Sequence, residues 1–238
     1  MRWRLGRKYS LKDLGIFNGF SDWHSHILPG VDDGIPSMDK ALEVLKQYEN
    51  LGINKIWLTP HIMEDFPNKT QDLKNKYEEL KSNWKGNIEI RLASENMLDN
   101  LFEKRLSEND FLPIGNDANH LLVETSYFTP PYNMDELLDE TQAKGYHIVL
   151  AHPERYMYMG NKEYQKLKDK GILFQMNLLS IVGVYGKEAQ QKAENLLKSD
   201  MIDFCGTDIH RLPHLLEGIE KPVIKHLISE KLIKLNNI

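Results

Sequence analysis

The sequence predicts an α/β fold in which about seven parallel strands close into a barrel. Two observations lead to this prediction. Short apolar runs alternate with helical periodicities along the chain, and His, Asp or Glu residues follow most of the apolar runs. Such an alternation favours a parallel sheet joined by right-handed crossovers. The polar residues would then meet at the C-terminal ends of the strands, where barrel enzymes build their active sites.

Length and composition favour a single domain. The chain has 238 residues, 41% of them hydrophobic, and a formal net charge of -5 with both signs interspersed, which gives no field for a nucleic-acid partner. No window approaches the roughly 20 apolar residues of a membrane span. Cys205, the only cysteine, follows an apolar run, which predicts a packed thiol in a reducing compartment. We therefore expect a cytoplasmic protein.

Residues 1–18 form a basic N-terminal extension in this interpretation, and residues 19–238 form the domain. The extension begins Met1-Arg-Trp-Arg-Leu-Gly-Arg-Lys8 and lacks the continuous apolar region of a secretory signal. Contact with an anionic membrane or an acidic partner is one interpretation, and a solvated tail is the simpler one.

The first half of the chain predicts three strands and two helices. His24 and His26 lie two residues apart, so on a strand both side chains share one face. After a turn rich in Pro and Gly, Ser37 caps a helix whose apolar period ends at Gly52. Apolar patterns predict the other elements: a strand at 53–58, a helix at about 70–84 and a strand at 88–93.

The second half continues the alternation. Its predicted strands are 121–123, 147–151, 172–177 and 202–206. Its predicted helices are 134–144, 163–170 and 187–198. A last helix after Pro222 is predicted from an apolar stripe at helical spacing, made of Ile224, Leu227, Ile228, Leu232 and Leu235.

Eight ionisable residues fall at or just after the ends of the predicted strands. They are His24, His26, His61, Glu95, Glu124, His152, Asp208 and His210. Asp32 and Asp33, in the turn after His26, add carboxylates that bind a hard cation or hold a ligand histidine in place. Burying so many ionisable groups without a cation would be costly. The rim is therefore a predicted metal site.

The ligand types indicate the chemistry. Nitrogen and oxygen ligands without a thiolate suit Mn, Fe or Zn, and their number suits two or three ions that share carboxylates. Such clusters hold a bridging hydroxide and clamp a phosphoryl group, which predicts hydrolysis. Phosphate esters are favoured because Arg155 and Arg211 closely follow His152 and His210, and an arginine fork suits phosphate oxygens. A surface salt bridge is the alternative for each arginine.

Several motifs carry a resemblance to a known family. They are His24-Ser-His-Ile-Leu-Pro-Gly-Val-Asp-Asp-Gly34, Thr59-Pro-His61, Glu95-Asn-Met-Leu98, Leu122-Val-Glu124, Gly145 with Ala151-His-Pro-Glu-Arg155, and Thr207-Asp-Ile-His210. With these motifs the chain resembles the PHP (polymerase and histidinol phosphatase) superfamily, and within it the CpsB/CapC/YwqE-type bacterial tyrosine-protein phosphatases. The first motif and Ala-His-Pro-Glu-Arg are the specific ones.

The resemblance implies a distorted seven-stranded PHP-type barrel with a trinuclear site. By position, one ion would be held by His24, His26, Glu95 and Asp208. A second would be held by Glu95, Glu124 and His152, so that Glu95 bridges the two. The third would be held by Asp33, His61 and His210. Mn is the expected ion, with Fe or Zn as alternatives.

The resemblance also implies an activity. The chain would hydrolyse phosphotyrosine through a metal-bridging hydroxide, commonly on the tyrosine-rich tail of a kinase of capsule or exopolysaccharide assembly. Arg155 matches a phosphate-binding arginine of the family, and Asp208 and His210 would join it in catalysis. The family's second arginine, several residues past the Asp-x-His motif, has no counterpart here. Arg211 is the nearest substitute, and the sequence leaves its role open.

Aromatic residues after Glu124 suit an aromatic substrate. Tyr127, Phe128 and Tyr132 are predicted to form a wall on which a phosphotyrosine ring packs, and covering the barrel edge is their other interpretation.

Two functions compete with phosphotyrosine hydrolysis. The nearer is a PHP phosphatase for a small molecule such as histidinol phosphate, and the long motif after His26 favours phosphotyrosine over it. The other is an inactive metal-binding scaffold that regulates a kinase, and the complete ligand set favours catalysis over it. The oligomeric state stays open.

Overall fold

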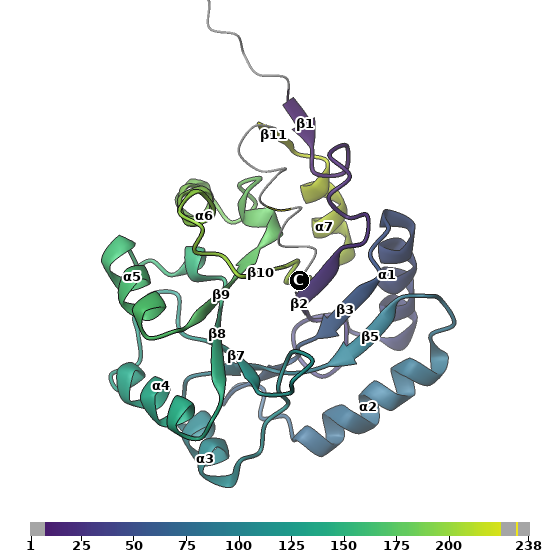
Figure 1. The fold of residues 1–238 in the computed structure, drawn as a ribbon. Helices are drawn as coiled ribbons and strands as arrows, with labels where there is room; N and C mark the ends of the chain where they lie inside the picture. Colours follow the sequence, from purple (N-terminus) through teal and green to yellow (C-terminus); the bar gives the residue numbers. More distant parts are fainter. Residues whose placement is uncertain (1–7, 225–231, 233–238) are drawn as a thin grey trace, which may run out of the picture.

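In the computed structural model, which describes residues 8–224 and Leu232, helices enclose a curled parallel sheet (Figure 1). Six strands pair in the order β10-β9-β8-β7-β6-β4 and three in the order β2-β3-β5, all of them parallel. The strands are β2 (Ser21–Ser25), β3 (Lys55–Leu58), β4 (His61–Ile62), β5 (Glu89–Leu92), β6 (Glu95–Met97), β7 (His120–Glu124), β8 (His147–Ala151), β9 (Leu173–Asn177) and β10 (Phe204–Gly206).

Backbone hydrogen bonds join these two sheets into one barrel. The chain just after β10 lies beside β2, where Asp208 N donates to His24 O (2.8 Å) and His26 N donates to Ile209 O (3.1 Å). β4 follows β3, and β6 follows β5, after a short interruption of each strand. Within these interruptions, Glu95 N donates to Pro60 O and keeps the two neighbouring segments paired. The barrel therefore has seven strand positions, because β3 with β4 and β5 with β6 each count as one. This confirms the predicted fold class.

Helices cover the outside of the barrel. They are α1 (Met38–Leu51), α2 (Thr70–Asn83), α3 (Asn100–Glu108), α4 (Met134–Ala143), α5 (Asn161–Asp169), α6 (Lys187–Lys198) and α7 (Leu212–Ile219), with two 3₁₀ helices, η1 (Pro153–Arg155) and η2 (Leu178–Ser180). At the start of α1, Ser37 Oγ accepts from Lys40 N, and Gly52 ends the helix at φ 94°. The sequence prediction lacks α3 and α7, although Asp99 caps α3 and Asn109 ends it at φ 53°.

The apolar core has two parts, separated by the sheet. On β7, Leu121 and Val123 pack beneath the helices, whereas Leu122 belongs to a cluster inside the barrel with Trp57 and Val149. This strand is therefore apolar on both faces, which explains its continuous apolar run. Cys205 is buried, as predicted, and burial raises the pKa of its thiol.

The two ends of the described chain pair with each other. β1 (Lys8–Ser10) and β11 (Pro222–Ile224) are antiparallel, so the helix predicted after Pro222 is wrong at its start. Its remaining residues lie outside the described part, apart from Leu232, which is helical and buried. Within the predicted N-terminal extension, Leu11, Ile16 and Phe17 are buried in the outer core. Among the described residues, no helix has the length and apolarity to cross a membrane.

Candidate metal centre

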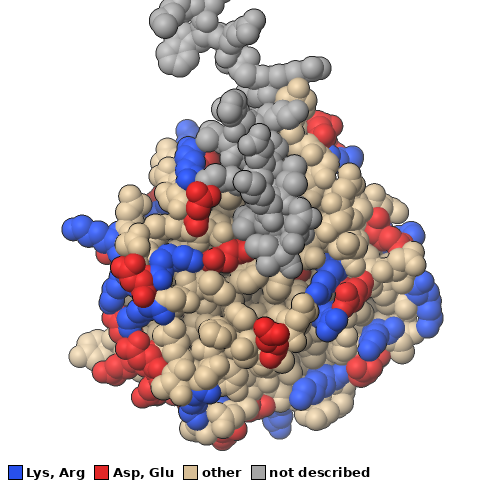
Figure 2. Space-filling view, viewed as in Figure 1, with Lys and Arg blue, Asp and Glu red and all other residues tan. Residues whose placement is uncertain are grey.

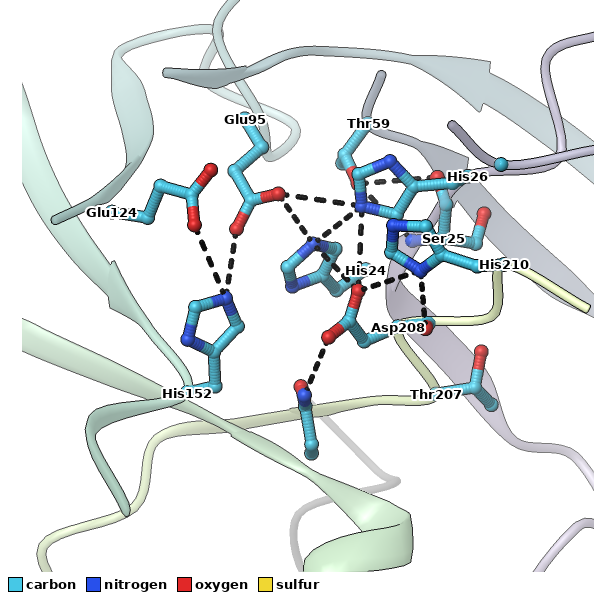
Figure 3. A network of polar contacts seen from close by, with 12 residues as sticks. His24, Ser25, His26, Thr59, Glu95, Glu124, His152, Thr207, Asp208 and His210 are labelled. Atoms are coloured by element: carbon cyan, nitrogen blue, oxygen red, sulfur yellow. Dashed lines mark hydrogen bonds and ion pairs between the residues drawn. The ribbon is translucent and has the colours of Figure 1, made fainter. Parts of the chain in front are cut away.

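The nine predicted ligands gather at the C-terminal ends of the strands, and Figure 3 labels all of them except Asp33 and His61. His24 is the last residue but one of β2, His61 and Glu95 begin β4 and β6, and Glu124 ends β7. The others lie in the loops that follow strands: His26, Asp33, His152, Asp208 and His210. The side chains of Asp33 and His210 are 58% and 28% exposed, whereas the rest of the set is almost entirely buried.

Glu95 lies at the middle of this cluster. Its Oε2 is 3.1 Å from His24 Nε2, 3.3 Å from His26 Nε2 and 3.1 Å from His61 Nδ1, and its Oε1 is 3.0 Å from His152 Nε2. Figure 3 shows the imidazoles of His24, His26 and His152 directed toward this carboxylate. A fully buried carboxylate that faces four imidazoles is placed to be shared between ions.

Donor atoms within 4.8 Å of one another fall into four overlapping groups. These are His24, His26 and Asp208; His24, Glu95 and His152; His61, Glu95 and Glu124; and His26, Asp33, His61 and His210. They contain all nine residues of the implied sets but divide them differently. His61 joins Glu124 through Nδ1 (3.0 Å) and Asp33 through Nε2 (3.5 Å), so it links two groups.

Unusual backbone conformations position several ligands. His152 and Asp208 have φ values of 34° and 51°, in the left-handed region that non-Gly residues seldom adopt. The register between β2 and β3 shifts between Asp22 and Ser25. A shift of this kind re-aims side chains. Here it allows Trp23 to pack with the inner apolar cluster while its neighbour His24 reaches the metal centre.

Further polar residues hold the ligands in place. Asp32 Oδ2 accepts from His26 Nδ1 and Gln175 Oε1 accepts from His24 Nδ1, each at 2.8 Å. Asn177 Nδ2 donates to Asp208 Oδ2 at 2.6 Å. The role of Asp32 matches one of its two predicted interpretations. Gln175 and Asn177 are missing from the prediction, although two polar residues on one face of an otherwise apolar strand were a visible signal.

Arg155 lies beside the cluster, between two aromatic rings. Its Nη1 donates to Asp208 Oδ2 (3.0 Å), and its guanidinium carbon is 4.4 Å from the ring centroids of both Tyr127 and Tyr185. These three residues line a cavity of about 340 Å³ over the metal centre, together with Arg211 and His214. The sequence analysis did not identify Tyr185 or His214, because neither belongs to a recognisable motif.

The other two predicted aromatic wall residues stand apart from this cavity. Phe128 is 70% exposed and lines an adjoining hollow, and the Tyr132 side chain extends fully into solvent. The structure therefore brings Tyr127 to the cavity but neither Phe128 nor Tyr132.

The charges of the cluster stabilise one another. Burial alone would raise the pKa of Glu95, yet the imidazoles of His24 and His61 hold that pKa well below its ordinary value. Burial likewise opposes the charged form of His26, but the Asp32 carboxylate and neighbouring acids raise the pKa of His26 well above its usual range. A hydrogen bond from His210 lowers the pKa of Asp33 to about 2.

The donor atoms fit divalent cations. His61 Nδ1, Glu95 Oε2 and Glu124 Oε1 are buried and have no hydrogen bond, which is costly unless another partner compensates them. Imidazole nitrogens and carboxylate oxygens without sulfur suit Mn, Fe or Zn. The set therefore fits a metal centre in its composition and geometry.

Comparisons with known proteins agree on one family. Residues 20–234 match the family model described as "Capsular polysaccharide synthesis, CpsB/CapC". The putative tyrosine-protein phosphatase CapC of Staphylococcus aureus is 28% identical over 220 residues, covering 90% of this chain and 84% of that protein. The tyrosine-protein phosphatase YwqE of Bacillus subtilis (strain 168) is 28% identical over 202 residues, covering 80% and 77%.

A solved structure shares the fold. It is described as one of the crystal structures of YwqE from Bacillus subtilis and CpsB from Streptococcus pneumoniae, "unique metal-dependent tyrosine phosphatases". It superposes with a TM-score of 0.77 at 24% identity, over 91% of this chain and 90% of the other. The likeness supports the curled α/β barrel over nearly its whole length.

Proposed function

The chain belongs to the CpsB/CapC family of capsular polysaccharide synthesis, and from this premise we propose that it is a metal-dependent tyrosine-protein phosphatase. The observation that carries the proposal is a cluster of nine His, Asp and Glu side chains with an arginine at its edge. A cluster of this kind suits phosphoryl transfer to water because both the nucleophile and the phosphoryl charge need cations.

In this proposal the ligands hold three ions around Glu95. His24, His26 and Asp208 bind the first, and Glu124 and His152 bind the second. Glu95 would be shared by these two ions, and Asp33, His61 and His210 would hold the third. Two of the donor groups share Glu95, which supports its place between ions, although these groups pair His152 with His24 and Glu124 with His61. Divalent ions in such a site lower the pKa of water toward neutrality and neutralise phosphoryl oxygens.

Arg155 binds the non-bridging phosphate oxygens. Its guanidinium is held between Tyr127 and Tyr185, which fixes the plane of its N–H groups before the substrate arrives. Asp208 accepts one of these N–H groups and so sets the position of the fork over the metal centre. His210 Nδ1 lies 3.0 Å from the backbone carbonyl oxygen of Asp208, and Arg155, Asp208 and His210 are the proposed catalytic residues.

Arg211 supplies the second cationic contact. It is exposed, directly follows His210 and lines the cavity beside His214. Its side chain can therefore reach a phosphate in the cavity that Arg155 also lines. The tyrosine-rich tail of a kinase of capsule or exopolysaccharide assembly is the proposed protein substrate, in keeping with the process that names the family.

Turnover of a phosphotyrosine peptide tests the function. Protein stripped of metal should be inactive, and added Mn²⁺ should restore hydrolysis of the peptide far more than hydrolysis of histidinol phosphate. Elemental analysis of the purified protein would identify the ions. Preferential turnover of histidinol phosphate would favour the small-molecule phosphatase, and metal binding without any turnover would favour the scaffold.

A further inference from the structure

Three of the four large apolar side chains that are exposed in the described part of the chain line hollows that adjoin the cavity, and Tyr132 does not. The structure describes four large ones: Phe128, Tyr132, Met157 and Leu216, at 70%, 107%, 58% and 36% exposure. Phe128 and Met157 line a hollow of about 310 Å³, here called the Phe128 groove, and Leu216 lines one of about 1020 Å³, the Leu216 groove. Exposed apolar groups that gather in this way mark an interaction surface.

Both grooves open from the cavity over the metal centre. The Phe128 groove shares Tyr127, Arg155 and Tyr185 with the cavity. The Leu216 groove, between α1 and α7, shares a different set with it: Asp33, His210, Arg211 and His214. The two grooves have no lining residue in common, so they leave the cavity on different sides.

The groove walls are held by contacts of the fold. In the Phe128 groove, Met157 N donates to Tyr127 O (2.8 Å), and Lys192 Nζ donates to Tyr156 O (2.7 Å). In the Leu216 groove, Ile35 and Val44 are buried lining residues. A preformed groove loses little freedom when it binds, which favours a flexible ligand such as a peptide.

Both grooves carry charges of both signs, but carboxylates are in excess in the Leu216 groove, where Asp32, Asp33, Glu43 and Glu217 outnumber Lys40 and Arg211. Lys192 pairs with Glu188 (2.9 Å) in the first, and Lys40 pairs with Glu43 (2.7 Å) in the second. On the face in Figure 2, Lys and Arg are likewise interspersed with Asp and Glu. The Phe128 groove therefore selects no ligand of one charge, whereas the carboxylates of the Leu216 groove disfavour acidic residues. Apolar contact is the source of selectivity that both grooves share.

We propose that the Phe128 and Leu216 grooves bind the two peptide segments that flank a phosphotyrosine and prefer apolar residues in both. The proposal rests on the proposed phosphatase function, because the phosphotyrosine itself must occupy the cavity. In an extended peptide the two flanking segments leave the phosphotyrosine in different directions, and the two grooves adjoin different parts of the cavity lining. A free phosphate ester fills only the cavity and touches neither groove.

Two half-peptides separate the grooves. One carries three apolar residues on the N-terminal side of phosphotyrosine only, and the other carries them on the C-terminal side only. We expect Phe128→Asp to lower kcat/KM for one half-peptide and Leu216→Asp to lower it for the other, each by about five- to ten-fold. Turnover of free phosphotyrosine should stay within about two-fold of wild type, which also shows that the variants fold.

Tyr132→Asp is the matched control, because this exposed aromatic side chain lines neither groove. Unchanged kcat/KM for both half-peptides in the Phe128 and Leu216 variants would overturn the proposal. It would also be overturned if both variants lowered kcat/KM for the same half-peptide only. A wild-type protein that fails to hydrolyse free phosphotyrosine would instead overturn the proposed function. Binding of non-hydrolysable phosphonate half-peptides, measured by calorimetry, would then still test the grooves.

Discussion

The two ends of the barrel differ in the side chains that the same strands present: one end is apolar and the other is ionisable. At the N-terminal end, Trp23 packs on Trp57 and Phe204, with ring centroids 6.0 and 4.4 Å apart. At the C-terminal end, buried imidazoles and carboxylates face one another around Glu95. Apolar burial stabilises the fold, whereas buried charges cost desolvation that their partners must offset. The barrel thus separates the residues that stabilise it from those that act.

β7 shows the change of chemistry within two residues. Leu122 belongs to the inner apolar cluster, and Glu124 lies 3.0 Å from His61 in the metal centre. Residues two apart on a strand share a face, so one face of β7 contributes to both ends. Substitutions at the two ends should therefore have separable effects.

The largest expected effect is that of Glu95→Ala. A bridging carboxylate completes two coordination shells, so its loss should remove more metal than any other single ligand change and lower turnover by about 10³-fold or more. Metal content per chain and kcat/KM for a phosphotyrosine peptide are the measurements. Retention of all metal by Glu95→Ala, with loss in His61→Ala, would show that Glu95 is not the bridge.

At the opposite end, Trp57→Ala should act on stability. Removing a buried aromatic side chain from the inner cluster should lower the free energy of unfolding by about 3–5 kcal/mol. Urea unfolding measures this loss, and metal content below the unfolding transition should remain that of wild type. Loss of metal from still-folded Trp57→Ala would contradict the separation of the two ends.

Arg155→Ala should leave the metals and the fold intact but lower turnover by about 10²-fold, the scale for removing a preorganised charge-stabilising donor. Arg155→Lys should recover little, because a point charge does not reproduce a two-pronged contact. Measurement of kcat/KM with metal content, for these variants and Arg211→Ala, tests the role. A large loss in Arg211→Ala alone would transfer phosphate binding to the loop after His210.

Gln175 lies where the two ends meet, since it lines a hollow at the apolar end and accepts from His24 Nδ1. Gln175→Leu should weaken metal affinity by about 10- to 100-fold, as is typical when a residue that orients a ligand is lost. Competition with a chelator measures this affinity, and Gln165→Leu on the exposed face of α5 is the control. Equal metal affinities in Gln175→Leu and Gln165→Leu would show that Gln175 does not orient a metal ligand.

The sequence could predict which strands carry the ligand residues, but not which residues hold those ligands in place. The predicted strands that are closely followed by His61, Glu95, Glu124 and His152 indicate a common site, because the C-terminal ends of parallel strands lie at the same end of a barrel. The same local patterns did not predict the short helix α3 or the strand at Pro222–Ile224. The strand depends on pairing with β1, some 200 residues away along the chain.

The sequence by itself determined which residues could bind metal and at which end of the barrel they lie, because both follow from local periodicity and residue type. Only the tertiary structure decided that Tyr185 packs on Arg155, that Gln175 holds His24 and that Tyr132 stays outside the cavity. Those contacts join residues distant in the chain. They depend on barrel closure and on the register shift in β2, which no local pattern encodes.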